Sequence, residues 1–210
     1  MTRFLFLILL FGHILYGQTT IRGTATISTH NVISDTLNNS PNRAFNDKVK
    51  LAQIDQSTAK VDIRLYTLHS LSNTKTVRRL FLVDTIWTAV EFDEWNKPVK
   101  IKKYKLKATP SFDSLILRLL SFNIMTLPNQ SELKDKMHKD VQETEDGYKT
   151  ERKIYVTDGE GYTIEIKIDN KFRVYQFDNP ETYSKFYDNV SELKDYFNIV
   201  QTFDKYLQRK

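Results

Sequence analysis

The chain has 210 residues, of which 40% are hydrophobic, 27% charged and 12% aromatic, a composition typical of a soluble globular protein with enough apolar side chains for a core. It contains no cysteine, which excludes disulfides, thiol nucleophiles, iron–sulfur ligation, cysteine-containing zinc sites and a lipid anchor on cysteine. The formal net charge of +5 is modest and accompanies no nucleic-acid-binding motif, so nucleic acid is not an expected partner.

The first 17 residues have the organisation of a secretory signal peptide. Arg3 supplies the charged tip, residues 4–15 form an apolar run, and Gly17 is a small residue before the polar Gln18. A bilayer span needs about 20 apolar residues, so this run is too short for one. We expect a signal peptide at residues 1–17 and a soluble periplasmic or secreted protein without stable membrane insertion after cleavage; a buried N-terminal strand or helix is the alternative.

Residues 18–47 read as an N-terminal strand followed by a polar loop. Apolar and polar side chains alternate within 19–34, and residues 35–47 are rich in asparagine, serine and aspartate, the composition of a loop. The remaining residues, 48–210, are expected to form a single domain.

From Lys60 to Lys107 the hydrophobic pattern has a period of two, which predicts a four-strand antiparallel meander. Its last strand shows an irregularity, since Tyr104 and Leu106 fall on the face opposite to Ile101 under strict alternation. One extra residue at Lys102-Lys103 restores a single apolar face, so we expect a β-bulge there.

Two helices are expected next. Thr109 is a candidate N-cap with Pro110 at the first helical position, followed by an apolar stripe within 112–120. After the break at Leu127-Pro128, residues 131–141 predict a second, more polar helix, and an acidic loop follows at 143–147.

The C-terminal third predicts three strands and a closing helix. The strands, 153–156, 162–168 and 172–177, are joined by Asp158–Gly161 and Asp169-Asn170, whose residue types tolerate the positive φ of hairpin turns. Residues 189–207 form an amphipathic helix that begins with a capping-box pattern, Asn189 with Glu192. Its apolar stripe comprises Leu193, Tyr196, Phe197, Val200, Phe203 and Leu207.

The expected fold is therefore α+β. It consists of antiparallel β-meanders with about seven or eight strands, a two-helix insertion, and a C-terminal amphipathic helix packed on a sheet. The patterns leave open whether the two meanders form one sheet.

Glu91 and Asp93 are the candidate catalytic pair. They are two residues apart on a predicted strand, so their side chains share a face about 7 Å apart, a separation that suits glycoside hydrolysis. Trp87 and Trp95 lie nearby to stack on sugar. The opposing interpretation, which we favour, is that alternating acids mark the solvent-facing side of a strand.

No metal or cofactor site is expected. His30, His69 and His138 are far apart and lack ligand spacing, and no G-x-S-x-G or glycine-rich phosphate loop occurs. The acidic cluster from His138 to Asp146 lacks the ordered ligands of a calcium loop and reads as a solvated loop.

Six lysines without an intervening acid lie within residues 97–107: Lys97, Lys100, Lys102, Lys103, Lys105 and Lys107. Such a run suits an anionic glycan or the phosphate-rich outer leaflet. Lysines also protect an exposed strand against edge-to-edge pairing, and this second interpretation is the one we favour from sequence.

The segment around Thr157-Asp158-Gly159, Tyr162–Glu165, Phe172–Tyr175 and Asn179-Pro180-Glu181 resembles a group of uncharacterised secreted proteins of Gram-negative bacteria of the Bacteroidetes type. The resemblance covers residues 150–207. It implies the strand–strand–helix order and export, and it carries no activity or site.

Two function classes follow from these observations. The first is an exported, non-catalytic binding or interaction module of the cell envelope, whose partner is an envelope protein or an anionic glycan. The second is a small glycan-active hydrolase that uses Glu91 and Asp93.

Overall fold

The computed structural model describes residues 18–21, 25–28, 41–96 and 99–210. The expected signal segment 1–17 and His30 lie outside these residues. In the described chain, none of the helices is long and apolar enough to cross a membrane.

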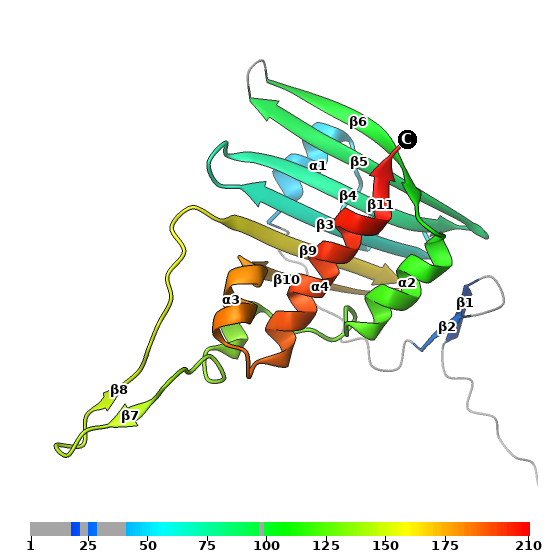
Figure 1. Ribbon diagram of the computed structural model, residues 1–210. Helices are drawn as coiled ribbons and strands as arrows, with labels where there is room; N and C mark the ends of the chain where they lie inside the picture. Colours follow the sequence, from blue (N-terminus) through cyan, green and yellow to red (C-terminus); the bar gives the residue numbers. More distant parts are fainter. Residues whose placement is uncertain (1–17, 22–24, 29–40, 97–98) are drawn as a thin grey trace, which may run out of the picture.

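One antiparallel sheet of seven strands organises the molecule (Figure 1). The expected N-terminal meander is its larger part, and the later hairpin adds beside the first strand of that meander, so both meanders belong to one sheet with the order β10-β9-β3-β4-β5-β6-β11. The α+β class and the strand number are confirmed. The strands are β3 (Val61–His69), β4 (Thr74–Val83), β5 (Ile86–Asn96), β6 (Val99–Ala108), β9 (Glu160–Ile168), β10 (Lys171–Asp178) and β11 (Leu207–Arg209).

Helices cover the two faces of the sheet unequally (Figure 1). On the helix-covered face, α2 (Phe112–Ser121) and α4 (Ser191–Tyr206) pack against the main core, with α3 (Pro180–Phe186) beside α4. On the other face, here called the α1 face, the short helix α1 (Arg43–Val49) packs Phe45 and Val49 in a smaller cluster. Because side chains alternate along a strand, β3, β4, β5 and β6 each supply residues to both clusters.

The two faces can be read from single strands. In β3, Ile63 and Leu65 belong to the main core, whereas Tyr66 belongs to the smaller cluster on the α1 face. In β5, Ala89 faces the main core and Phe92 the smaller cluster. The sheet is therefore buried on both sides, which is the reason that a polar alternation in these strands does not mark a solvent-facing surface.

The β-bulge expected at Lys102-Lys103 is absent, and that prediction is wrong. Strands β5 and β6 pair without interruption from Ala89↔Leu106 to Asn96↔Val99. Ile101 packs on the smaller cluster while Leu106 packs in the main core. Both faces of β6 have apolar neighbours, so strict alternation needs no extra residue.

The two-helix insertion differs in detail from its prediction. Helix α2 is capped by Ser111, whose Oγ accepts a hydrogen bond of 3.1 Å from the Ser114 N–H, and not by Thr109. The second helix is a 3-10 helix at Gln130–Leu133 rather than an α-helix over 131–141, with Leu133 as its buried residue. Met137, four residues after Leu133, also packs against the main core although it lies beyond the 3-10 helix.

A short hairpin follows the 3-10 helix. Its strands, β7 (Gln142–Glu143) and β8 (Lys149–Thr150), project away from the sheet (Figure 1). The strand expected at 153–156 does not form, and Tyr155 within it is 81% exposed. Ile154 still packs against the main core, so the apolar alternation marks which side chains are partly buried without making a strand.

The closing helix α4 packs on the sheet as predicted, with two corrections. Its N-cap is Val190 without a side-chain hydrogen bond, and Asn189 instead donates to the Lys136 carbonyl at 3.5 Å. Phe197 is half-buried, whereas Ile199, outside the predicted stripe, is fully buried. Helix α3, which the periodicity of the sequence did not predict, packs beside α4.

The N-terminal segment contains β1 (Gln18–Ile21) and β2 (Ala25–Ser28), which pair antiparallel. The domain boundary expected at 47/48 falls within α1, whose Phe45 is 3% exposed and packs on the sheet. The packed part of the chain thus includes residues that precede that boundary.

Candidate functional site

Glu91 and Asp93 lie on the helix-covered face of β5, side by side as predicted. Their carboxylates are not free. Glu91 Oε2 accepts a hydrogen bond of 3.0 Å from Arg78 Nε, and its Oε1 accepts one of 2.8 Å from Arg209 Nε. Arg209 Nη2 also lies 2.9 Å from Asp93 Oδ2, so one guanidinium bridges the pair. The Glu91 side chain is 4% exposed, which contradicts the expected solvent-facing position.

This arrangement suits an ion-pair network rather than acid–base chemistry. Burial acts to lower the pKa of Arg209, but the hydrogen bonds and charges of Glu91 and Asp93 raise that pKa above its ordinary value. A glycosidase acid needs an environment that keeps its carboxyl protonated. Guanidinium contacts stabilise the ionised form instead.

The same face carries a row of polar contacts toward β9. Thr76 Oγ1 donates to Asp93 Oδ1 at 3.3 Å, and His69 Nε2 lies 3.2 Å from that hydroxyl. His69 Nδ1 lies 2.9 Å from Glu160 Oε1. His69 is therefore a member of a surface hydrogen-bond network, an arrangement that its position in sequence does not reveal.

The acidic cluster from His138 to Asp146 is divided among separate partners. His138 Nδ1 lies 2.6 Å from Glu151 Oε2, and Asp140 accepts from Arg152 Nη1 at 2.9 Å. In the part of the chain that the structure describes, no group of three or more histidine and acidic side chains has metal-binding geometry.

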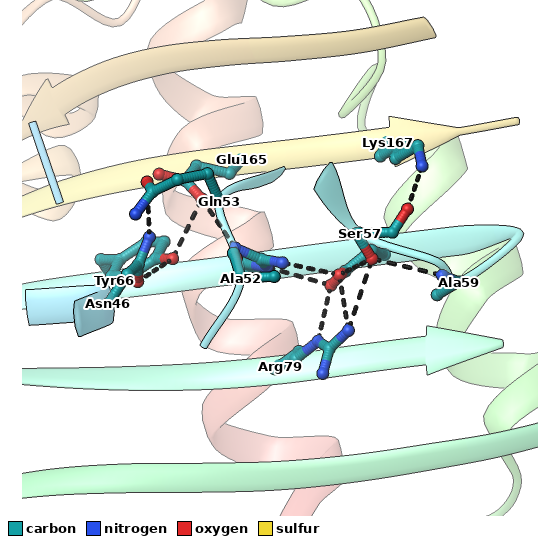
Figure 2. Close-up of polar contacts among 11 residues, drawn as sticks. Asn46, Ala52, Gln53, Ser57, Ala59, Tyr66, Arg79, Glu165 and Lys167 are labelled. Atoms are coloured by element: carbon teal, nitrogen blue, oxygen red, sulfur yellow. Dashed lines mark hydrogen bonds and ion pairs between the residues drawn. The ribbon is translucent and has the colours of Figure 1, made fainter. Parts of the chain in front are cut away.

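A buried charged network lies on the opposite, α1 face of the sheet (Figure 2). The side chains of Asp62, Arg64 and Glu165 are each 0% exposed. Arg64 Nη2 lies 2.8 Å from Asp62 Oδ2, and Arg64 Nη1 lies 3.3 Å from Glu165 Oε2. Arg79 Nη2 makes a second contact of 2.8 Å with Asp62 Oδ2. Buried charges persist only with such partners, since an unpaired ion in the interior is very costly.

The segment from α1 to Ser57 covers this network on the α1 face and supplies further hydrogen-bond partners. Ser57 Oγ donates to Asp62 Oδ2 at 2.6 Å, and the Ala52 carbonyl accepts from Arg64 Nη1 at 2.8 Å. The Tyr66 hydroxyl lies 2.9 Å from Asn46 Oδ1 and 3.0 Å from Glu165 Oε2 (Figure 2). Each charged group thus has partners from two directions.

The electrostatic consequences follow from burial and pairing. Burial acts to raise the pKa of Asp62, but hydrogen bonds from Arg79 and Arg64 hold it below its ordinary value. Burial, followed by the charge of Glu165, raises the pKa of Tyr66, so its phenol stays neutral. At neutral pH these shifts keep Asp62 ionised and Tyr66 neutral.

A cavity of about 430 Å³ adjoins this network. Tyr66 and Asn42 belong to both, since they line the cavity and also approach Glu165. Two charged residues of the cavity wall come from strand ends: Lys75 lies near the start of β4, and Asp178 is the last residue of β10. The cavity therefore has the size of a small-molecule pocket, and Tyr66 and Asn42 join its wall to the buried network.

Burial perturbs both of these charged groups. Burial lowers the pKa of Lys75, although the negative charge of Glu94 acts to raise it. Lys75 Nζ donates a hydrogen bond of 3.1 Å to Asn42 Oδ1. Burial raises the pKa of Asp178, whose carboxylate accepts no hydrogen bond from any residue of the described chain. Perturbed titratable groups beside a cavity are typical of a binding or reaction site.

The strand pattern places these residues on predicted strands and does not indicate that they are buried. The alternation of Asp62 and Arg64 in β3, and of Glu165 and Lys167 in β9, looks like an exposed polar face. The opposite charges of Arg64 and Glu165 were the one available signal of burial, since these two residues are direct partners in the sheet. The covering segment is what buries them, and its position depends on tertiary packing.

Comparisons with protein-family models, with curated proteins and with solved structures give no match to this chain.

Proposed function

We propose that this protein is an exported, non-catalytic binding module of the cell envelope, and that a saccharide unit of a glycan occupies the cavity beside Tyr66. The observation that carries the proposal is this cavity of about 430 Å³, backed by a buried network that holds its wall in one arrangement. Preorganised walls reduce the entropy that binding must offset.

The chemistry of the wall supports a polyhydroxylated ligand. Among the described residues, the side chains of Thr163 and Gln176 and the carboxylate of Asp178 line the cavity with no hydrogen-bond partner. Together they offer hydroxyl, amide and carboxylate groups, which match the alternating donors and acceptors of sugar hydroxyls. The half-buried ring of Tyr183 lines the same cavity and offers apolar surface that suits the C–H face of a sugar ring.

The ion pairs of Glu91 and Asp93 weigh against the alternative of a carboxylate-pair hydrolase. Arg209 contacts both acids, and Arg78 takes the remaining oxygen of Glu91. A hydrolase at this position would have to break those contacts to free an acid and a base. The binding function requires no such rearrangement.

Export is part of the proposal and rests on the basic tip, apolar run and small residue of Met1–Gly17. Cell fractionation followed by intact-mass measurement of the native protein tests it. We expect a mature protein that lacks these residues outside the cytoplasm. An intact N-terminus in the native protein would contradict export and leave the cavity proposal standing.

Saturation-transfer NMR with N,N′-diacetylchitobiose and maltotriose as probes tests the binding site. Gln176 is exposed and its backbone N–H bonds to Asn129 Oδ1 at 3.0 Å, so Gln176→Trp fills the cavity while keeping that contact. Gln142→Trp, on the projecting hairpin, is the matched control. We expect saturation transfer to at least one probe that Gln176→Trp abolishes and Gln142→Trp preserves; transfer that survives Gln176→Trp would place binding elsewhere.

A further inference from the structure

The outer edge of β6 is only partly paired. Strand β11 pairs with β6 from Leu106 to Ala108, and the Lys210 N–H donates to the Lys105 carbonyl at 3.0 Å. No described strand pairs with residues 99–104 on that side. An unpaired stretch about six residues long therefore continues the line of β11 along the sheet edge.

The backbone of this stretch presents hydrogen-bonding groups to the outside. In an antiparallel strand the N–H and C=O of alternate residues point to the same side. Lys105 points its carbonyl outward to Lys210, so Lys103 and Ile101 point theirs outward as well. These groups form the template to which an added strand pairs.

The edge lacks the distortion that usually prevents such pairing. The register between β5 and β6 runs without a bulge through this stretch. Bulges are a common device that blocks strand addition, and lysine side chains, which this stretch does carry, are another. The positive charge of these lysines disfavours basic partner strands and favours acidic ones.

The lysines lie on both faces of the edge. Lys100 and Lys102 are opposite Trp95 and Asp93 on the helix-covered face, and Lys103 and Lys105 lie on the α1 face. Within the described chain none of these lysines, nor Lys107, forms an ion pair. Lys97 lies outside the described residues.

The acids beside this edge are already paired with other cations. Glu91 and Asp93 are bound by Arg209, and Glu94 lies 3.0 Å from Lys48. The positive charge of the edge is therefore not neutralised from within the protein. An unbalanced charge of one sign attracts a partner of the other.

We propose that the Lys100–Tyr104 stretch of β6 is a docking edge for an extended acidic peptide segment of a partner protein. The peptide adds antiparallel to β6 in continuation of β11. Its main chain pairs with Ile101 and Lys103, and its carboxylates lie between the lysines of both faces. The site is separate from the cavity and does not depend on glycan binding.

Fluorescence anisotropy with a labelled six-residue peptide, Glu-Val-Glu-Glu-Val-Glu, tests the proposal. This peptide places two glutamates on each face of an added strand. Two further probes carry N-methyl groups on the odd or on the even residues, and so remove the N–H groups of one side only. We expect saturable binding that one methylation pattern weakens at least tenfold more than the other, because only one set of N–H groups faces β6. Equal affinity of the two methylated peptides would overturn strand addition and indicate attraction to any anionic surface.

Variants of the protein separate backbone pairing from charge. Lys103→Pro removes the outward N–H and the charge, whereas Lys103→Gln removes the charge alone, and proline is tolerated at an outward position of an edge strand. We expect Lys103→Pro to bind the peptide at least tenfold more weakly than Lys103→Gln, with unchanged circular dichroism. Equal affinity of the two variants would contradict main-chain pairing at this position.

Charge reversal provides the second comparison. Lys100, Lys103 and Lys105 changed together to glutamate should abolish binding, while the same change at Lys60, Lys149 and Lys194 keeps the net charge equal and should preserve it. Binding lost equally in both triple variants would refute a localised edge. Absence of binding to the wild type, together with self-association when the three edge lysines are changed to threonine, would show that they only guard the edge.

Discussion

Arg64 and Glu165 lie 101 positions apart in the chain and form an ion pair of 3.3 Å with both side chains fully buried. They are direct partners in the register of β3 and β9, so the pair fixes how the C-terminal hairpin adds to the first meander. A slip of the hairpin by one residue would turn Glu165 toward the main core and leave Arg64 without this partner. The buried pair therefore specifies the register at which the two parts of the sheet join.

Arg64→Leu should destabilise the protein strongly. Removing the guanidinium leaves Asp62 and Glu165 as buried acids with fewer partners, and breaking a buried pair in this way typically costs about 3–5 kcal/mol. Urea unfolding followed by circular dichroism measures this loss. Arg43→Leu, an exposed position at the start of α1, is the control and should stay within about 0.5 kcal/mol of wild type. A similar unfolding midpoint for both variants would show that the buried network does not hold the sheet together.

Acid should weaken the network through Asp62. Burial acts to raise the pKa of Asp62, but hydrogen bonds from Arg79 and Arg64 lower it below its ordinary value of 3.8. The stability that ionised Asp62 contributes is therefore present above pH 3.8 and is lost as pH falls through the lower folded-state value. The unfolding free energy of wild type should drop more steeply than that of Asp62→Asn in urea titrations below this pH. Parallel pH profiles would show that Asp62 is not stabilised by the two arginines.

Asp178 should behave in the opposite sense. Burial raises its pKa above the ordinary value of 3.8, so the ionised carboxylate destabilises the folded state once pH exceeds the folded-state value. Because Asp178 is exposed to solvent, which screens this effect, Asp178→Asn should raise the unfolding free energy only slightly at pH 7 and leave it unchanged below pH 3.8. A variant less stable than wild type at pH 7 would indicate that the carboxylate has a stabilising partner. The same variant should weaken saturation transfer from the saccharide probes, since it removes one charged acceptor from the cavity.

Two phenylalanines of α4 should differ in their contribution to stability. Phe203 is 0% exposed in the main core, and Phe203→Ala should cost about 3–5 kcal/mol. Phe197 is half-buried and lines a second cavity beside α3, so Phe197→Ala should cost clearly less. Thermal unfolding of both variants gives the comparison. Equal losses would mean that the helix buries both faces to the same extent.

Local pattern determined most of the secondary structure. The period of two in 61–67, 77–83, 87–95 and 162–168 predicted strands that the structure contains, and the period of 3.6 predicted α4. Hairpin chemistry at Asp169-Asn170 also predicted the β9–β10 turn, where Asp169 has a φ of 52°. These features depend on residues close in sequence, for which side-chain spacing is sufficient information.

Tertiary packing decided which polar residues are buried. Asp62 and Glu165 alternate with apolar neighbours as solvent-facing acids do, yet the segment that carries Asn46, Ala52 and Ser57 covers them. The bulge at Lys102-Lys103 was wrongly predicted for the same reason. Strand β6 has apolar neighbours on both faces, so its apolar residues need not share one face and no extra residue is inserted. Sequence thus determined where strands and the closing helix lie, while burial, the ion pairs of Glu91 and Asp93, and the cavity beside Tyr66 depend on segments distant in sequence. A period reports which residues share a face, and only the element packed on that face decides whether water reaches it.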